Sequence, residues 1–233
     1  MQLFTGTSGF AYKEWKGNFY PDDLPASEML RYYSAQFRTV EINNTFYRMP
    51  SAATLETWAG QVPEEFVFVL KAPQQITHRK RLQDAGEPVE LFFRNAEIIG
   101  TRLGPVLLQL PPNLKKDLAR LTDFLALIPP ARRVAFEFRH ETWFEDDVYD
   151  ALRRSGAALC IAHGEAIETP VIATTDWGYL RLRQVAYDDG DLSGWIDRVR
   201  AQAWGDVFAF FKHEDEGTGP RLARRFEQLF AAR

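Results

Sequence analysis

Short apolar runs alternate with amphipathic stretches from one end of the chain to the other. Residues 66–71 read Phe-Val-Phe-Val-Leu-Lys, and aromatic and β-branched residues in such a run are typical of a buried strand. Seven further runs have the same character, at residues 3–7, 39–43, 105–110, 133–138, 157–162, 178–182 and 207–211. The pattern therefore predicts eight strands.

Between these runs, apolar residues recur at helical spacing. Residues 88–103 place Val89 and Phe92 on one face of a helix, and Ser27 and Ser51 stand where a helix N-cap is expected. Helices are expected at residues 27–37, 51–61, 88–103, 114–128, 145–155, 192–203 and 220–232. The connection 164–177 is rich in Thr and Pro, which predicts that it carries no full helix.

Strand–helix alternation predicts parallel strands joined by right-handed crossovers. Eight such units fill all 233 residues without a linker, a repeat or a low-complexity segment. We therefore expect an α/β protein with a single (β/α)₈ TIM-barrel domain over residues 1–233, in which residues 8–26 form a structured first loop. An open, doubly wound sheet is the alternative.

In a barrel, functional side chains stand at the C-terminal strand ends and in the loops that follow. Because side chains alternate along a strand, Glu41 and Asn43 are expected to face inward, and so are Glu137 and Arg139. All four histidines also follow a predicted strand. The candidate catalytic residues are Glu41, Glu137, His163 and His213, and the candidate substrate-binding residues are Thr7, Ser8, Asn43, Lys71, His78, Gln109, Arg139, His140, Trp143, Arg181 and Lys212.

These residues also have structural interpretations. Glu41 and Glu137 can neutralise Lys71, Arg139 or Arg181 at the barrel mouth, since buried charges need partners. Each histidine can be a hydrogen-bonded structural residue, and residues 212–216 can form a solvated loop. If the glutamates are catalytic instead, we expect at least one of Glu41→Gln and Glu137→Gln to leave stability unchanged or higher.

Cations outnumber carboxylates at the predicted rim, which favours a phosphate or carboxylate ligand. Aromatic residues of the loops can stack on a base or a sugar, or pack only on one another. These are Phe10, Tyr12, Trp15, Phe46, Tyr47, Trp143 and Trp177. The sequence contains no nucleophile elbow, no Walker loop and no zinc-type Cys/His spacing.

Composition limits the classes of partner and the cellular compartments that are expected. A net charge of −4 argues against broad, non-specific binding to nucleic acid or acidic lipid. The single cysteine, Cys160, has no partner for an internal disulfide, which fits a reducing compartment. The first residues lack a signal-peptide pattern, and no run of 18 apolar residues occurs. We therefore expect a cytoplasmic protein that does not associate with membranes.

Several segments resemble the YecE-like family, also called domain of unknown function 72. They include Gly6-Thr7-Ser8-Gly9-Phe10-Ala11-Tyr12, Val40-Glu41-Ile42-Asn43-Asn44-Thr45-Phe46-Tyr47, Gln109-Leu110-Pro111-Pro112 and Glu137-Phe138-Arg139-His140-Glu141-Thr142-Trp143. The resemblance implies a TIM barrel and no particular reaction. The chain departs from the family at Arg183-Gln184, where the family has His-Gly, and at Lys212-His213, where it has Asn-Asn.

The leading hypothesis is an enzyme that acts on a phosphorylated or nucleotide-like substrate by acid–base hydrolysis or a related reaction. Lys71, Arg139 and Arg181 would hold the anion, and Glu41 and Glu137 would move protons. No cofactor is expected, although a divalent metal bound by the two glutamates and a histidine is a variant. The alternatives are a non-catalytic module that binds nucleotides or nucleic acid and a carbohydrate-active enzyme.

Overall fold

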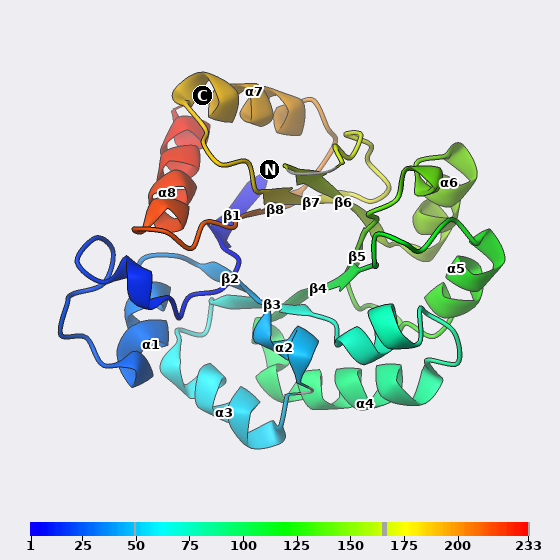
Figure 1. Ribbon diagram of the computed structural model, residues 1–233, viewed down its shortest axis with the longest axis horizontal. Helices are drawn as coiled ribbons and strands as arrows, with labels where there is room; N and C mark the ends of the chain where they lie inside the picture. The colour runs from blue at the N-terminus through cyan, green and yellow to red at the C-terminus, as the bar shows by residue number, and fades with distance from the viewer. Residues whose placement is uncertain (49, 165–166, 233) are drawn as a thin grey trace.

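All strand pairings in the sheet are parallel, in the order β1-β8-β7-β6-β5-β4-β3-β2. The computed structural model describes residues 1–48, 50–164 and 167–232. Its strands are β1 Gln2–Thr7, β2 Thr39–Ile42, β3 Val67–Lys71, β4 Leu103–Gln109, β5 Val134–Glu137, β6 Ala158–His163, β7 Trp177–Leu182 and β8 Asp206–Phe211. The helices ring the strands (Figure 1).

The ring of strands closes where β1 meets β2. Ser8 and Glu41 form a parallel bridge across this seam, and the Gly9 amide donates to the Glu41 carbonyl at 2.8 Å. Gly6 allows the close approach, because a Cβ there would lie 2.3 Å from the Thr39 carbonyl oxygen. Eight parallel strands with intervening helices confirm the predicted TIM barrel.

The helices follow the predicted order, and their bounds differ from the predicted ones by several residues. They are α1 Met29–Ser34, α2 Asn44–Tyr47, α3 Ala52–Gln61, α4 Gly86–Ala96, α5 Leu118–Leu125, α6 Asp146–Ser155, α7 Asp189–Arg200 and α8 Thr218–Ala231. Between β6 and β7, residues 167–176 carry no helix, as their composition predicts. The short elements that were not predicted include α2 and the single π-helical turn Gln75–Arg79 after β3.

Helix starts test the capping predictions. Ser51 caps α3 as expected, since its hydroxyl accepts from the Thr54 amide at 3.2 Å. The prediction for Ser27 was wrong, because Ser27 lies in the 3₁₀ turn Ala26–Glu28 that precedes α1. In the unit that follows β4, Asp117 rather than Leu114 marks the start of the helix, and its carboxylate accepts from the Arg120 amide.

Side-chain alternation divides the core into two layers. An inner layer fills the barrel and includes Phe4, Val69, Leu107, Tyr179 and Phe210. The outer layer, formed by the remaining strand positions, packs against the helices. The same alternation turns the polar residues two positions beyond the inner layer into the barrel mouth.

One aromatic prediction about the rim was wrong. Trp177 is the first residue of β7 and pairs with Asp206, the first residue of β8, so it lies at the N-terminal end of the barrel. It belongs to the inner core and is 3% exposed. In the described residues, no helix is long and apolar enough to cross a membrane.

Candidate functional site

Arg181 lies at the centre of a buried ion-pair network inside the barrel mouth. Its Nη2 donates to Glu41 Oε1 at 2.8 Å, and its Nη1 donates to Glu137 Oε2 at 2.5 Å. Both glutamates are 0% exposed and Arg181 is 2% exposed. Strands β2, β5 and β7 are therefore joined by one guanidinium.

Neutral side chains extend this network on both sides. The Tyr179 hydroxyl donates to Glu41 Oε2 at 2.6 Å. Gln109 donates from Nε2 to Glu137 Oε1 at 3.0 Å, while its Oε1 accepts from Lys71 Nζ at 2.8 Å. The result is a continuous hydrogen-bonded path from Lys71 on β3 to Tyr179 on β7.

The environment keeps both carboxylates ionised. Burial by itself would raise the pKa of Glu137, but Arg181, Arg183 and the amide of Gln109 outweigh it and lower the pKa to about 2. For Glu41, burial is again opposed by Arg181 and by hydroxyl hydrogen bonds, and the net shift of its pKa is downward. A general acid needs a raised pKa, so this arrangement suits charge compensation better than proton donation.

The environment of Lys71 disfavours the charged form of its side chain, whereas that of the two glutamates favours it. Lys71 is 8% exposed, and no ion pair to it is found in the part of the chain that the structure describes. Its Nζ lies 4.0 Å from the centre of the Phe46 ring. Burial, followed by the neighbouring Arg181 charge, lowers the pKa of Lys71 to about 8.

His78 also contacts Phe46. The two rings meet edge to face at 4.8 Å, and His78 Nδ1 is 2.9 Å from the Thr77 hydroxyl. Burial lowers the pKa of His78 to about 4, and the charges of Lys71 and Arg139 act in the same direction. The imidazole is therefore neutral at pH 7.

Further cations stand around this network. Arg183 Nη2 donates to Glu137 Oε1 at 2.9 Å. Arg139 lines a cavity of about 40 Å³ together with Glu137 and Arg183, and no hydrogen bond or ion pair holds its guanidinium within the described ranges. Lys212 is 45% exposed, 3.9 Å from Glu214. Positive charge thus exceeds negative charge at the mouth.

The structure brings together eight of the predicted site residues. Five of them form the network itself, and Arg139 and His78 lie at its edge; the five are Glu41, Lys71, Gln109, Glu137 and Arg181. Ser8 joins them through its bridge to Glu41. The predicted inward orientation of Glu41 and Glu137 is confirmed.

Two further predicted residues lie at the mouth without joining the network. Asn43 lines a cavity of about 100 Å³ with Gly9 and Tyr12. Lys212 follows β8 and lies close enough to contribute to lowering the pKa of Lys71. Both remain candidates for contact with a ligand.

Other predicted residues are engaged elsewhere. His163 faces the helices, where its Nδ1 is 3.0 Å from the Tyr187 hydroxyl and its ring packs on Trp195 at 5.0 Å. Thr7 hydrogen-bonds to the Tyr33 hydroxyl on α1. The structure does not bring either residue to the network.

His213 and His140 have structural partners. His213 is 8% exposed, and its Nε2 lies 2.5 Å from the Gln184 carbonyl. His140 precedes the 3₁₀ turn Glu141–Trp143, and its Nδ1 accepts from the Thr142 amide at 3.3 Å. A hydrogen-bonded structural histidine, the alternative noted from the sequence, describes both side chains.

The prediction that Trp143 contacts substrate was wrong. Trp143 is 0% exposed and stacks on Phe138 with ring centres 4.7 Å apart, while its Nε1 donates to the Leu114 carbonyl at 2.7 Å. Such a ring belongs to the core and offers no face to a ligand. Trp15, another predicted rim aromatic, is also 0% exposed.

Sequence reasoning missed one member of the network and undervalued two neighbours. Tyr179 was not a candidate, although it shares the inward face of β7 with Arg181 two residues later, and that spacing was the available signal. Arg183 was noted only as one of the cations of the rim and Phe46 only as a loop ring able to stack on a ligand, and neither was named as a site residue.

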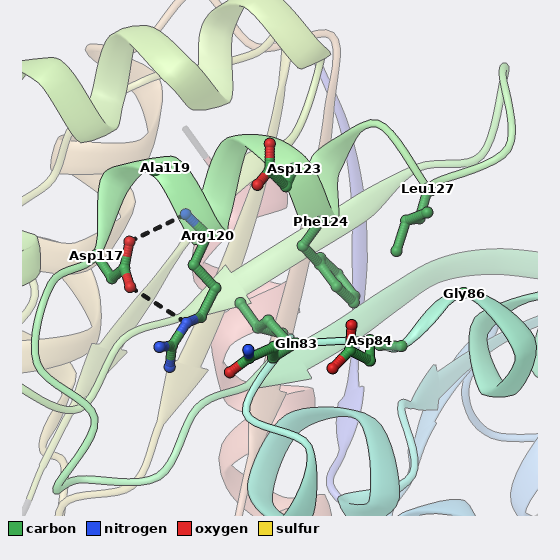
Figure 2. Close-up of a pocket in the computed structure, with 11 residues that line it drawn as sticks. Gln83, Asp84, Gly86, Asp117, Ala119, Arg120, Asp123, Phe124 and Leu127 are labelled. Carbon is green, nitrogen blue, oxygen red and sulfur yellow. Dashed lines mark hydrogen bonds and ion pairs between the residues drawn. The ribbon is translucent and has the colours of Figure 1, made fainter.

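A cavity of about 520 Å³ lies away from the mouth, between residues 82–86 and α5 (Figure 2). Asp84 and Asp123 are among the residues that line it, and Asp117, another lining residue, pairs with Arg120 at 3.2 Å. Within the described residues, no group of three or more His, Cys, Asp or Glu side chains gathers as metal ligands here or at the mouth.

Comparison with known proteins places the chain among relatives without a named activity. A family model described as "Protein of unknown function DUF72" matches residues 4–233. The UPF0759 protein YunF of Bacillus subtilis is 23% identical over 92% of this chain and 79% of its own length. The UPF0759 protein YecE of Escherichia coli is 30% identical over 49% of this chain and 43% of its own.

Solved structures support the fold. A DUF72 family protein from Thermotoga maritima superposes with a TM-score of 0.88 at 27% identity, over 99% of this chain and 100% of that one. A DUF72 family protein from Enterococcus faecalis gives a TM-score of 0.84 at 16% identity, over 99% and 96% of the two chains. The second likeness bears on the fold alone.

Proposed function

The chain belongs to the DUF72 family, whose description names no activity, and from the geometry of its barrel mouth we propose that it is an enzyme acting on a phosphorylated or nucleotide-like small molecule. Acid–base chemistry at the mouth, by hydrolysis or a related reaction, is the proposed mode of catalysis. The anion-binding groups in this proposal are Arg139 and Arg183, because Arg181, which the sequence also suggested, is paired with both glutamates.

One observation carries the proposal: the buried carboxylates of the mouth are paired with Arg181 and Arg183, and other cations remain. Glu41 and Glu137 both bind the Arg181 guanidinium and Glu137 also binds Arg183, and among the described residues neither glutamate forms an ion pair with Lys71 or Arg139. Unneutralised cations at the base of a partly enclosed site attract a phosphate, which accepts several charge-assisted hydrogen bonds at once.

The roles within the site differ from those expected from sequence. Because the pKa values of Glu41 and Glu137 are lowered, we assign these residues to holding Arg181 in place. Lys71, with a pKa near 8, is the group best suited to accept a proton near neutral pH. Paired, low-pKa carboxylates provide no general acid, which makes the carbohydrate-active alternative less favourable.

Calorimetry with inorganic phosphate, ribose 5-phosphate and AMP tests the binding step. We expect one site per chain, and Arg139→Met should weaken binding by about tenfold or more, as for the loss of one charge-assisted hydrogen bond. The matched control is Arg94→Met on α4, where the exposed Arg94 pairs with Glu90 and has no other ion pair among the described residues. Equal binding by wild type and Arg139→Met contradicts the proposed site.

Turnover separates an enzyme from a binding module. Each phosphorylated compound that binds is incubated with the protein, and its products are followed by phosphorus NMR. Product formation that Lys71→Met abolishes supports catalysis at this site. Binding without any product over a broad set of such compounds instead supports the non-catalytic alternative.

A further inference from the structure

Lys71 is the buried cation that the ion-pair network leaves without a carboxylate. Its Nζ donates to a neutral acceptor, Gln109 Oε1, and faces the ring of Phe46. Only 8% of the residue is exposed. A buried ammonium without a carboxylate is rare, because its desolvation is not compensated. This environment favours the neutral amine, which carries a reactive lone pair.

Resting on the function proposed above, we infer that the Lys71 amine is a nucleophile that forms an imine with the carbonyl carbon of a phosphorylated aldehyde or ketone. The Nζ lone pair forms the C–N bond, the π bond of the carbonyl breaks, and one amine proton passes to the carbonyl oxygen, giving a carbinolamine. Loss of the second amine proton and of the hydroxyl as water leaves the C=N bond. Water reverses the same steps, so the cycle needs no oxidant, reductant or co-reactant.

The charges around Lys71 fit this role. Arg181 and Lys212 oppose protonation of the amine, Glu41 and Glu137 favour it, and burial makes the largest contribution, so that the pKa falls to about 8. His78 is neutral at pH 7. Compared with a lysine whose pKa is 10.5, the fraction of free amine near pH 7.5 is on the order of 10²-fold larger.

The position of the amine also suits a substrate with a phosphate at one end. Gln109 connects Lys71 to Glu137, and Glu137 lines the same small cavity as Arg139 and Arg183. A phosphate held by the two arginines would bring the rest of a short molecule towards Lys71. The inference therefore names the substrate class as small phosphorylated carbonyl compounds.

Borohydride trapping tests the covalent step. The protein is incubated with glyceraldehyde 3-phosphate, reduced with sodium borohydride and digested, and the modified lysine is located by mass spectrometry. We expect one adduct on Lys71, with a trapping rate that rises with pH and has its midpoint near 8. Glyceraldehyde without the phosphate should label Lys71 at least about tenfold more slowly, because it lacks the group that the arginines bind.

Two variants sharpen the result. Lys71→Arg keeps the positive charge but removes the amine, so it should lose the adduct and still bind inorganic phosphate. Lys115→Met removes an exposed lysine of the β4–α5 connection and should leave trapping unchanged. Localising the adduct on the wild-type protein keeps the test decisive even if Lys71→Arg folds poorly.

Each outcome separates the inference from the proposed function. Adducts spread over exposed lysines, or none at all, overturn the imine even if phosphate binds in calorimetry, and the proposed function then survives. An adduct on Lys71 that forms equally fast with and without the substrate phosphate supports the nucleophile and contradicts the anion site. Phosphate-dependent labelling of Lys71 alone supports both.

Discussion

Arg181 and Glu41 form an ion pair of 2.8 Å in which neither side chain exposes more than 2% of its surface. Their strands, β7 and β2, are not neighbours in the sheet, so the contact crosses the interior of the barrel. Glu137 binds the same guanidinium from β5. The pair is thus a structural tie across the barrel mouth as well as a feature of the candidate site.

Neutralising Glu137 should destabilise the fold. Glu137→Gln leaves Arg181 and Arg183 without a shared carboxylate, and we expect a loss of about 3–5 kcal/mol in the free energy of unfolding. Glu41→Gln should cost less, because Arg181 keeps Glu137. Urea denaturation of both variants gives these values.

The control is Glu90→Gln, which removes an exposed ion pair with Arg94 and should change stability by no more than about 0.5–1 kcal/mol. Because both glutamates are buried and paired, we now expect both Gln variants to lose stability. From the sequence we had expected at least one of them to be neutral or stabilising. If both variants melt at or above the wild-type temperature, the structural role assigned to the network is wrong.

Lys71 should make stability rise with pH in the alkaline range. Its folded-state pKa of about 8 lies below the ordinary value of 10.5, so between these limits the unfolded chain binds a proton that the folded protein lacks. Stability then increases with pH, at up to about 1.4 kcal/mol per pH unit. Below pH 8 the burial penalty is present in full.

Lys71→Met removes this titration. We expect the variant to be more stable than wild type at pH 7 and to lose the rise between pH 8 and 10.5 that wild type shows. Thermal melts at several pH values measure both effects, with Lys115→Met as the control, because Lys115 is exposed. A wild-type stability that is flat or falling over this interval, with no difference from Lys71→Met, rules out the shifted lysine.

Gly6 should be required for closure of the barrel. Gly6→Ala would place a methyl group 2.3 Å from the Thr39 carbonyl oxygen at the seam between β1 and β2, so backbone must shift. We expect a loss of at least about 2 kcal/mol. Gly60→Ala in α3 is the matched control, because open space surrounds its position and Ala favours a helix by up to about 1 kcal/mol.

Amide hydrogen exchange locates the damage from Gly6→Ala. Amides of β1 and β2 should lose protection before those of β5 and β6, since the seam is the site of the clash. A variant as stable as wild type, with unchanged protection in β1, would show that the seam does not depend on this glycine.

Trp143 should behave as a core residue. Trp143→Ala removes a fully buried ring from its stack on Phe138, and we expect a loss of about 3–5 kcal/mol. Phosphate binding by the folded fraction should stay unchanged, because the ring does not reach the mouth. Equilibrium denaturation together with calorimetry separates the two effects, and weaker binding at full stability would restore Trp143 to the site.

Most of the fold could be predicted from local pattern. The strand at residues 66–71 is observed as β3, from Val67 to Lys71, because a run of aromatic and β-branched residues has few other stable conformations. Helix ends were harder. Ser27 and Ser51 are equally good N-caps by composition, yet only Ser51 caps a helix, because the chain before α1 tightens into a 3₁₀ turn.

The sequence predicted which residues belong to the candidate site better than it predicted which of them pair with one another. Strand alternation alone turns Glu41, Lys71 and Glu137 inward, so their place at the mouth follows from parity. Parity does not reveal which cation each carboxylate binds. Which groups pair depends on how far each side chain extends across the barrel. In the structure Arg181 binds two carboxylates, whereas Lys71 donates to the neutral Gln109.

The sequence by itself determined the order of strands and helices and the identity of the residues that face inward, because both depend on local periodicity. Only the tertiary structure decided that His163 turns to the helices, that Trp143 is sealed in the core and that the glutamates share one guanidinium. Those outcomes depend on contacts between residues far apart in the chain, where distance and burial, rather than residue type, set the charge and the exposure of each group.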